Sequence, residues 1–171
     1  MKKLILTPTF LFVFVYLCFG SHAWAAEKVY YDINPEKTSK INFAVPWFIN
    51  SDLPTRKQQF GRDVADTLAK ALKFHGIISI LPTSEYGGEQ KANLQQFGVD
   101  FTVAGNYFIS GENLKFELRL IEVSTGTMLL GKKYQGVMGQ KEEMLYRFCD
   151  RVIYELTGQK GIASSKIAFV T

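Results

Sequence analysis

The sequence predicts one α/β domain of the α+β type, in which two or three helices pack on a mixed sheet of five or six strands. The order strand, helix, strand over residues 41–81 predicts a βαβ opening with a parallel strand pair and a right-handed crossover. Strand segments separated by turns between residues 101 and 134 predict an antiparallel meander. A chain of 171 residues has room for one domain of ordinary size and too little for two.

Residues 1–25 have the pattern of a secretory signal peptide. The cationic start Met1-Lys2-Lys3 precedes an apolar run over residues 4–19. The small residues of Ala23-x-Ala25 then form the pattern that signal peptidase reads, so we place the cleavage after Ala25. The sequence therefore predicts a periplasmic protein, exported by a cleaved signal peptide.

Two other interpretations of this segment are disfavoured. An uncleaved membrane anchor would need about 20 apolar residues to span the bilayer, and the run is shorter than that. A lipoprotein would use Cys18 as its lipidated residue, but Leu17 stands where lipoprotein signals carry a small residue.

Residues 26–34 predict an extended arm ahead of the globular domain, which we assign to residues 35–171. The run Val29-Tyr30-Tyr31-Asp32-Ile33 is rich in residues that favour strands, and Asn34-Pro35 ends it. Such an arm can add a strand to the sheet edge of a partner protein. The alternative is that it pairs with its own sheet or stays loose.

The βαβ opening consists of a strand at 41–45, a helix at about 55–74 and a strand at 77–81. Trp47 and Phe48 fall in the predicted loop between the first strand and the helix. The helix is amphipathic, because apolar residues recur at every fourth position: Phe60, Val64, Leu68 and Leu72.

The second half of the chain predicts the meander and a helix that packs on it. In the middle strand Phe116, Leu118 and Leu120 share one face, so the other face is expected to meet solvent. The expected elements are a short helix around 90–97, strands at 101–110, 115–120 and 128–134, a helix at about 140–156 and a last strand at 167–170.

Charge gives no argument for nucleic acid as a partner. Without residues 1–25 the chain carries 18 basic against 16 acidic residues, a net charge of +2. Nucleic-acid binding requires clustered lysine and arginine, and Lys132-Lys133 is the one adjacent basic pair late in the chain.

Residue types that carry chemistry are scarce after position 25. Cys149 and His75 are the single cysteine and histidine there, which excludes an intrachain disulfide and leaves a structural zinc site without ligands. We interpret Cys149 as a small core residue and His75 as a side chain covering carbonyls at a helix end. No glycine-rich phosphate loop or nucleophile motif occurs. We therefore expect no enzyme, no cofactor and no metal site.

Seven blocks of the sequence, taken in order, resemble the amino-terminal domain of the TolB family, a periplasmic component of the Tol–Pal envelope system. The most specific is the Leu-Thr-Gly-x-x-Gly run at 156–161 that leads to Lys-Ile-Ala-Phe-Val at 166–170. Together the blocks cover nearly all of the chain after the signal peptide: residues 29–33, 41–48, 72–78, 97–105, 116–123, 150–158 and 161–170.

The chain departs from the family pattern in residues and in length. The family usually has aspartate, serine, tryptophan, histidine, phenylalanine and arginine where this chain has Ala71, His75, Leu94, Tyr146, Ala163 and Lys166. TolB proteins also continue into a six-bladed β-propeller just past the strand at 167–170, whereas this sequence ends at Thr171.

The resemblance implies a non-enzymatic protein that binds other proteins of the envelope. In the family, the segment after the signal peptide contacts the carboxy-terminal domain of TolA, and the propeller contacts the lipoprotein Pal. We therefore expect a TolA-like inner-membrane partner, and no Pal contact without a propeller. The expected partner-binding residues are Glu27, Lys28, Val29, Tyr30, Tyr31, Asp32, Ile33 and Asn34.

Two alternative functions stay open at this stage. A CsgG-like assembly or secretion subunit has a similar strand–helix–strand opening, but it would need a lipidated cysteine and pore-forming hairpins that are not visible in the sequence. A small-ligand-binding periplasmic domain would need a pocket with converging polar groups.

Overall fold

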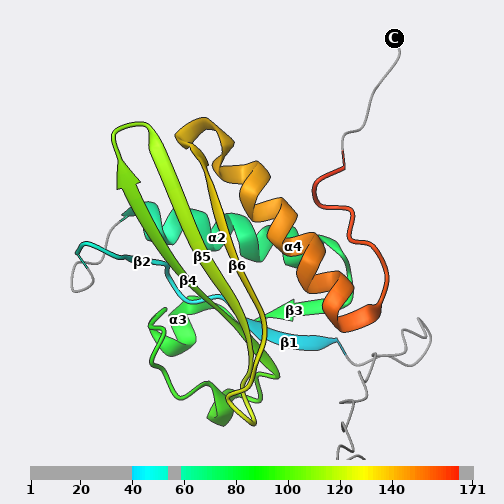
Figure 1. Cartoon of the computed structure of the whole chain (residues 1–171). Helices are drawn as coiled ribbons and strands as arrows, with labels where there is room; N and C mark the ends of the chain where they lie inside the picture. Colours follow the sequence, from blue (N-terminus) through cyan, green and yellow to red (C-terminus); the bar gives the residue numbers. More distant parts are fainter. Residues whose placement is uncertain (1–39, 54–58, 166–171) are drawn as a thin grey trace, which may run out of the picture.

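Six strands form one mixed sheet, and its main path runs in the order β3-β1-β4-β5-β6 (Figure 1). The computed structural model describes residues 40–53 and 59–165, so the arm at 26–34 and the strand expected at 167–170 lie outside the described residues. The strands are β1 (Ile41–Ala44), β2 (Ile49–Asn50), β3 (Ile78–Ile80), β4 (Phe101–Ser110), β5 (Asn113–Glu122) and β6 (Met128–Val137). The predicted α/β class and mixed sheet are confirmed.

The βαβ opening is present as the sequence predicts. Strand β1 pairs in parallel with β3, with Ile41 opposite Ile78, and α2 (Gln59–Phe74) connects the two strands. The first residues expected in this helix, 55–58, lie outside the description. Strand β1 also pairs in parallel with β4 on its other side, which places the first described strand inside the sheet rather than at its edge.

The meander is also confirmed, and its strands are longer than predicted. Both β5 and β6 contain ten residues, because pairing continues past the segment of strict alternation. A shift of register lies between Leu120 and Ile121, opposite the start of β6. Leu129 of β6 is the residue left without a partner there, so the irregularity lies in β6, and β5 keeps its regular register with β4 through Glu122.

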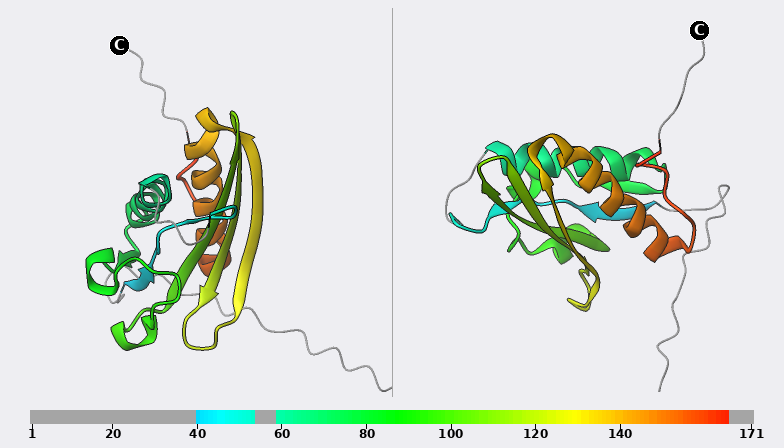
Figure 2. Two further views of the ribbon diagram at one scale, coloured as in Figure 1. Left: turned by 90° about the vertical axis from the view of Figure 1, so that its left-hand side faces the viewer. Right: turned by 45° about the horizontal axis from the view of Figure 1, so that its top comes forward.

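The two long helices cover one face of the sheet (Figure 2). Helices α2 and α4 (Lys141–Thr157) pack against each other and enclose the main core, in which Phe43, Phe116 and Phe148 have no exposed surface. Neighbouring residues of a strand point to opposite faces, and Ala44 accordingly belongs to a second, smaller core with Tyr86, Leu94 and Val99.

The segment that supplies this smaller core differs from the prediction of one short helix around 90–97. The segment instead forms α3 (Thr83–Tyr86) and the 3-10 helix η1 (Leu94–Phe97). Gly87 and Gly88 separate them, both with positive φ. Two consecutive residues in the left-handed region end a helix, and the polar stretch after them leaves no apolar repeat to start another at residue 90.

Phe48 is buried and Trp47 is half-buried, because glycines on α2, on β4 and in the turn after α3 make room for them. The Phe48 ring lies over Gly105 of β4, where an added Cβ would come within 2.4 Å of it. The backbone of Phe48 meets α2 at Gly61, whose carbonyl accepts the Phe48 N–H at 3.0 Å. An added Cβ at Gly61 would lie 2.1 Å from the Phe48 carbonyl oxygen.

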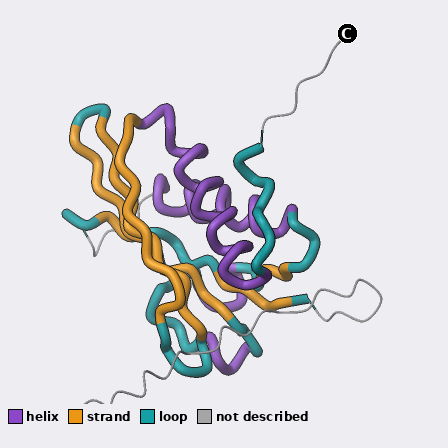
Figure 3. The backbone as a smooth tube through the Cα atoms, turned by 45° about the vertical axis from the view of Figure 1, so that its right-hand side comes forward, coloured by secondary structure: helices purple, strands orange, loops and turns teal. Residues whose placement is uncertain are grey.

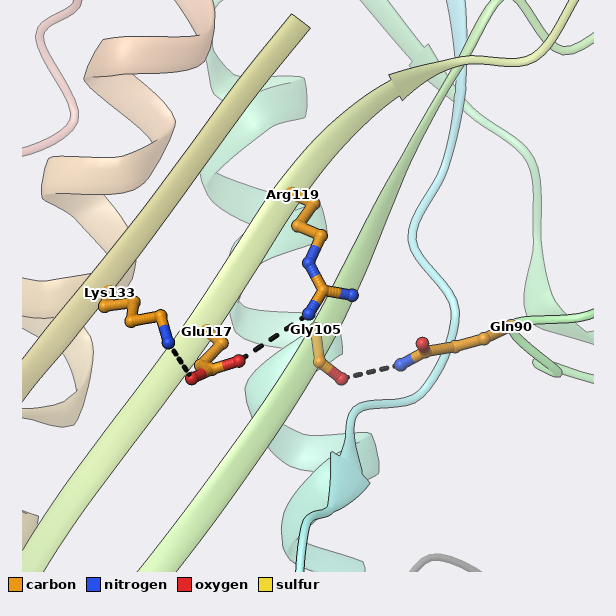
Figure 4. A network of polar contacts seen from close by, with 5 residues as sticks. All are labelled: Gln90, Gly105, Glu117, Arg119 and Lys133. Atoms are coloured by element: carbon orange, nitrogen blue, oxygen red, sulfur yellow. Dashed lines mark hydrogen bonds and ion pairs between the residues drawn. The ribbon is translucent and has the colours of Figure 1, made fainter. Parts of the chain in front are cut away.

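Trp47, the residue before Phe48, is held by a separate set of contacts. Its N–H donates to the Gly88 carbonyl at 3.0 Å, and the Arg62 guanidinium lies 4.3 Å from the ring centre. Gln90 Nε2 donates to the Gly105 carbonyl at 2.6 Å (Figure 4). It also donates to the Trp47 carbonyl at 3.2 Å. The Gln90 amide therefore links the segment between β1 and β2 to β4. It does so at a point of β4 that lies between its pairing with β1 and its pairing with β2.

We expect Gly105→Ala to destabilise the domain by about 1–3 kcal/mol, because the new methyl group would overlap the buried Phe48 ring. Chemical denaturation measures this change. Gly139→Ala is the matched control, since nothing lies within 4 Å of a Cβ there, and it should change the free energy of unfolding by less than about 0.5 kcal/mol. Equal stability of the two variants would contradict the packing described for Phe48.

Candidate functional site

The predicted partner-binding segment, Glu27–Asn34, lies outside the described residues, but the structure shows where the chain enters the domain. At that point the Ile41 N–H donates to the Ile77 carbonyl at 2.9 Å. Asn42 is held at three atoms: its N–H donates to Asp100 Oδ2 at 2.8 Å, its Nδ2 to the Gly98 carbonyl at 3.1 Å, and its carbonyl accepts the Asp100 N–H at 2.9 Å. The entry point is therefore fixed to the two neighbouring strands.

The segment that leaves α4 is fixed by one carboxylate. Asp150 Oδ1 accepts the Ala163 N–H at 2.7 Å, and Oδ2 accepts the Ser164 N–H at 3.1 Å and its hydroxyl. These bonds hold the loop after α4 against that helix (Figure 3). Gly161 allows the close approach, because an added Cβ would lie 2.5 Å from the Asp150 Cα.

In Figure 1 the described chain begins at the lower right, at β1, and ends at the upper right, after the loop that follows α4. Asp100 holds the backbone at the start of β1, and Asp150 holds the backbone of the loop after α4. Hydrogen bonds to an ionised carboxylate are among the stronger ones in proteins. Segments attached at either point therefore leave the domain in defined positions.

The two side chains considered for chemistry are packed rather than poised for reaction. Cys149 is fully buried in the main core, as predicted, and burial raises the pKa of its thiol to about 12. Burial also lowers the pKa of His75, opposed by the Asp150 charge. His75 Nε2 is buried and has no hydrogen-bond partner within the described residues, so this atom does not make the expected cap.

One pocket lies between β6, α4 and the segment after α4. Its volume is about 380 Å³ and it is open to solvent. Its one carboxylate, that of Asp150, already holds the exit loop. The pocket therefore resembles a shallow surface depression more than an enclosed ligand site, and it is lined by Lys132, Tyr134, Arg147, Asp150, Arg151 and Ser164.

Within residues 40–53 and 59–165, no group of three or more histidine, cysteine or acidic side chains is placed to hold a metal ion. In the same residues, no helix has the length and apolar character that crossing a membrane requires.

Comparison with known proteins assigns this architecture. No model of a known protein family matches the chain. The chain is 50% identical over 149 residues to Tol-Pal system protein TolB of Desulfotalea psychrophila, a match that covers 87% of this chain and 34% of that protein. It is 34% identical over 143 residues to TolB of Desulfosudis oleivorans, covering 77% of this chain and 33% of that protein. This chain is a homologue of TolB.

The chain spans about a third of the length of these curated TolB relatives. A crystal structure of TolB from Acinetobacter baumannii matches with a TM-score of 0.54 at 14% identity, over 74% of this chain and 30% of that one. At that identity the match shows a shared fold. The recognition of TolB from the sequence blocks is thereby confirmed.

Several of the TolB-like blocks supply the contacts described above. The block 41–48 contains the entry strand and Phe48, and the block 97–105 contains Asp100 and Gly105. The block 150–158 contributes Asp150 to the exit loop of the block 161–170. Within the described residues, the TolB-like blocks therefore contribute mainly to the contacts that hold this domain together.

Sequence reasoning assigned no role to Asp150 or Gln90. Asp150 lies between the buried Cys149 and the charged Arg151 in the sequence of α4, as a solvated helix residue can, and its partners are 13 and 14 positions away. The available signal was Gly161, a glycine shortly after the end of α4 that can mark a close approach of two backbone segments. Gln90 gave no signal, because its partners belong to two segments that only the fold brings together.

We expect Asp150→Asn to loosen the exit loop, because an amide cannot accept hydrogen bonds at both of its terminal atoms. The free energy of unfolding should fall by about 1–2 kcal/mol. In hydrogen exchange, the amides of Ala163 and Ser164 should exchange faster. Asp63→Asn on the exposed face of α2 is the matched control, and equal protection in both variants would contradict the clamp.

We expect the Cys149 thiol to resist modification in the folded protein. Its pKa, raised from an ordinary 9.0 to about 12, leaves almost no thiolate at pH 8, and the side chain is buried. A thiol reagent at pH 8 should label residues 26–171 rapidly in denaturant and slowly without it. Because the folded pKa is raised, the stabilisation from this thiol is complete below pH 9 and is lost as the pH rises toward 12. Fast labelling of the native protein would contradict the packing.

Proposed function

We propose that this chain works in the Tol–Pal system of the cell envelope, as a periplasmic domain that binds other proteins. The observation that carries the proposal is the 50% identity to Tol-Pal system protein TolB over 87% of the chain. Because the chain spans a third of that relative, the proposal concerns the activity of this domain and not of the whole relative.

A role without catalysis fits the side chains of the described domain. Cys149 is buried in the main core and the imidazole of His75 is desolvated, so neither presents a nucleophile or a base to a substrate. Asp100 and Asp150, two carboxylates with defined partners, hold backbone amides at the ends of the domain. These contacts support a scaffold that positions its terminal segments.

The partner of the arm is the finer part of the proposal. We propose that Glu27–Asn34 contacts a TolA-like protein by adding a strand to the edge of that protein's sheet. Val29, Tyr31 and Ile33 would share one face of such a strand. The attachment of Ile41 and Asn42 inside the sheet supports this, because the arm is then joined to the centre of the domain through a short connector.

Export is the remaining part. We propose that residues 1–25 direct the chain to the periplasm and are removed after Ala25. A Tol–Pal relative that covers most of the chain supports this location. Amino-terminal sequencing of the protein recovered from a periplasmic extract would give Ala26 as its first residue if the proposal is right.

We expect a chain of residues 26–171 to retain the carboxy-terminal domain of a TolA-like protein, and a chain without residues 26–34 to lose it. Co-purification on an affinity resin measures both. Triple replacement of Val29, Tyr31 and Ile33 by serine should weaken retention as strongly as the deletion, because those side chains supply the apolar face.

The matched control replaces Lys28 and Asp32, on the opposite face, by serine and should retain the partner. Retention by the deleted chain would show that another surface binds the partner and would overturn the assignment to the arm. Loss of binding in all variants, with residues 26–171 intact and folded, would overturn the choice of a TolA-like partner.

A further inference from the structure

Strand β6 is the long exposed edge of the sheet. The sheet path ends at β6 on one side and at β3 on the other, and β3 has three residues where β6 has ten. Among the described residues, strand β6 pairs with β5 alone, over almost its whole length. An edge of this length presents a row of backbone groups that another strand can pair with.

The register identifies which backbone groups face outward. The Met138 N–H donates to the Glu112 carbonyl, so amides at alternate positions before Met138 point toward β5. The amides and carbonyls of Gly131, Lys133 and Gln135 therefore point away from the sheet. Val137 follows the same alternation, and the side chain of Gln140 accepts its N–H at 3.2 Å.

The ends of this edge are apolar. Met128 is 57% exposed, Leu129 37% and Val137 45%, which are three of the most exposed large apolar side chains in the described residues. They stand toward the two ends of the strand, three or four positions from the charged pair at its centre. Such side chains can pack against apolar residues of an added strand.

The middle of the edge is basic. Lys132 and Lys133 lie on opposite faces of the strand, because side chains alternate along it. Lys133 shares Glu117 with Arg119, at 2.6 and 3.6 Å, on the face away from α2 and α4 (Figure 4). Lys132 faces the other way, into the pocket that also contains Arg147 and Arg151.

Carboxylates near these cations are already engaged. Glu117 binds Lys133 and Arg119, Glu143 binds Arg147 at 3.1 Å, and Asp150 holds the exit loop. Cations outnumber carboxylates around the centre of β6, and both faces of the strand therefore favour acidic residues on any strand that adds there.

A second copy of β6 fits this edge poorly. In a two-fold antiparallel pairing, a residue can only face a residue on the same side of the sheet. The registers with the largest overlap then place Lys132 opposite Lys132, or Lys133 opposite Lys133. Like charges directly opposite each other destabilise a strand pair.

We propose that the β6 edge is a second binding surface, which accepts an extended segment of a partner protein as an added strand with acidic residues at its centre. The backbone of Gly131, Lys133 and Gln135 pairs with the segment, and Lys132 and Lys133 select its acidic residues. This surface is distinct from the arm at 26–34. Failure of the arm to bind its partner would therefore not contradict the proposal for β6.

The test uses residues 26–171 and a fluorescent ten-residue peptide with Glu-Glu at its centre and alternating valine and threonine on both sides. Fluorescence anisotropy should show saturable binding that weakens as salt is added, since exposed charges are screened. A peptide with Lys-Lys at its centre should not bind measurably. In NMR spectra, the acidic peptide should shift the amides of Gly131, Lys133 and Gln135.

Two variants at one position isolate the backbone contribution. Gln135→Pro removes an outward amide from an edge strand, where proline is tolerated, and should weaken binding of the peptide by about tenfold. Gln135→Ala keeps that amide and should bind like the parent chain. Thermal unfolding monitored by circular dichroism confirms that both variants are folded.

Five results would overturn the proposal. Equal binding by the folded Gln135→Pro variant, or amide shifts away from β6, would exclude the edge. Equal binding of the Lys-Lys peptide would exclude the acidic preference. Binding that appears only after deletion of residues 26–34 would show that the chain's own arm occupies the edge. A dimer of residues 26–171 that Gln135→Pro dissolves would show that a second copy occupies it.

Discussion

The position of Phe48 is the constraint on which the rest of this domain depends. Its ring occupies the space above Gly105, and its backbone touches α2 at Gly61, so one residue fixes the distance between the helix and the sheet. Side chains at either glycine would push the two layers apart. With the layers at this distance, Phe48 lies edge-on to Phe116, with ring centres 6.1 Å apart, and the main core closes around both.

Fixing Phe48 there leaves β4 without a neighbouring strand between its contacts with β1 and β2. A gap in a strand edge leaves backbone groups without partners, which is costly when they are shielded from water. Gln90 resolves this by donating to the Gly105 and Trp47 carbonyls, with the segment that carries it following Gly88 beside the Trp47 ring. The irregular segment between α3 and η1 is therefore part of the sheet's hydrogen bonding rather than a passive loop.

The sequence predicted those parts of the structure whose signals are local. The alternation of Phe116, Leu118 and Leu120 and the repeat from Val64 to Leu72 each reflect one element lying on a core, and both were confirmed. Strand β2, the Gln90 bridge and the Asp150 clamp join segments that are 13 to 57 positions apart, and no local pattern encodes them. The arm was predicted from its composition, and its assignment as the binding site stays a prediction.

The two proposed surfaces use β-pairing in opposite senses, and the charges on β6 explain how both can exist in one molecule. The arm would donate a strand to a partner, whereas β6 would receive one. A receiving edge that is ten residues long invites pairing with any exposed strand, including its own copy. In the self-pairings with the largest overlap, Lys132 or Lys133 would lie opposite its own copy. The repulsion disfavours pairing of two β6 strands but leaves the edge accessible to a different strand. A partner with acidic residues converts the same repulsive pair into its recognition element, which makes selectivity at this edge an electrostatic property rather than one of shape.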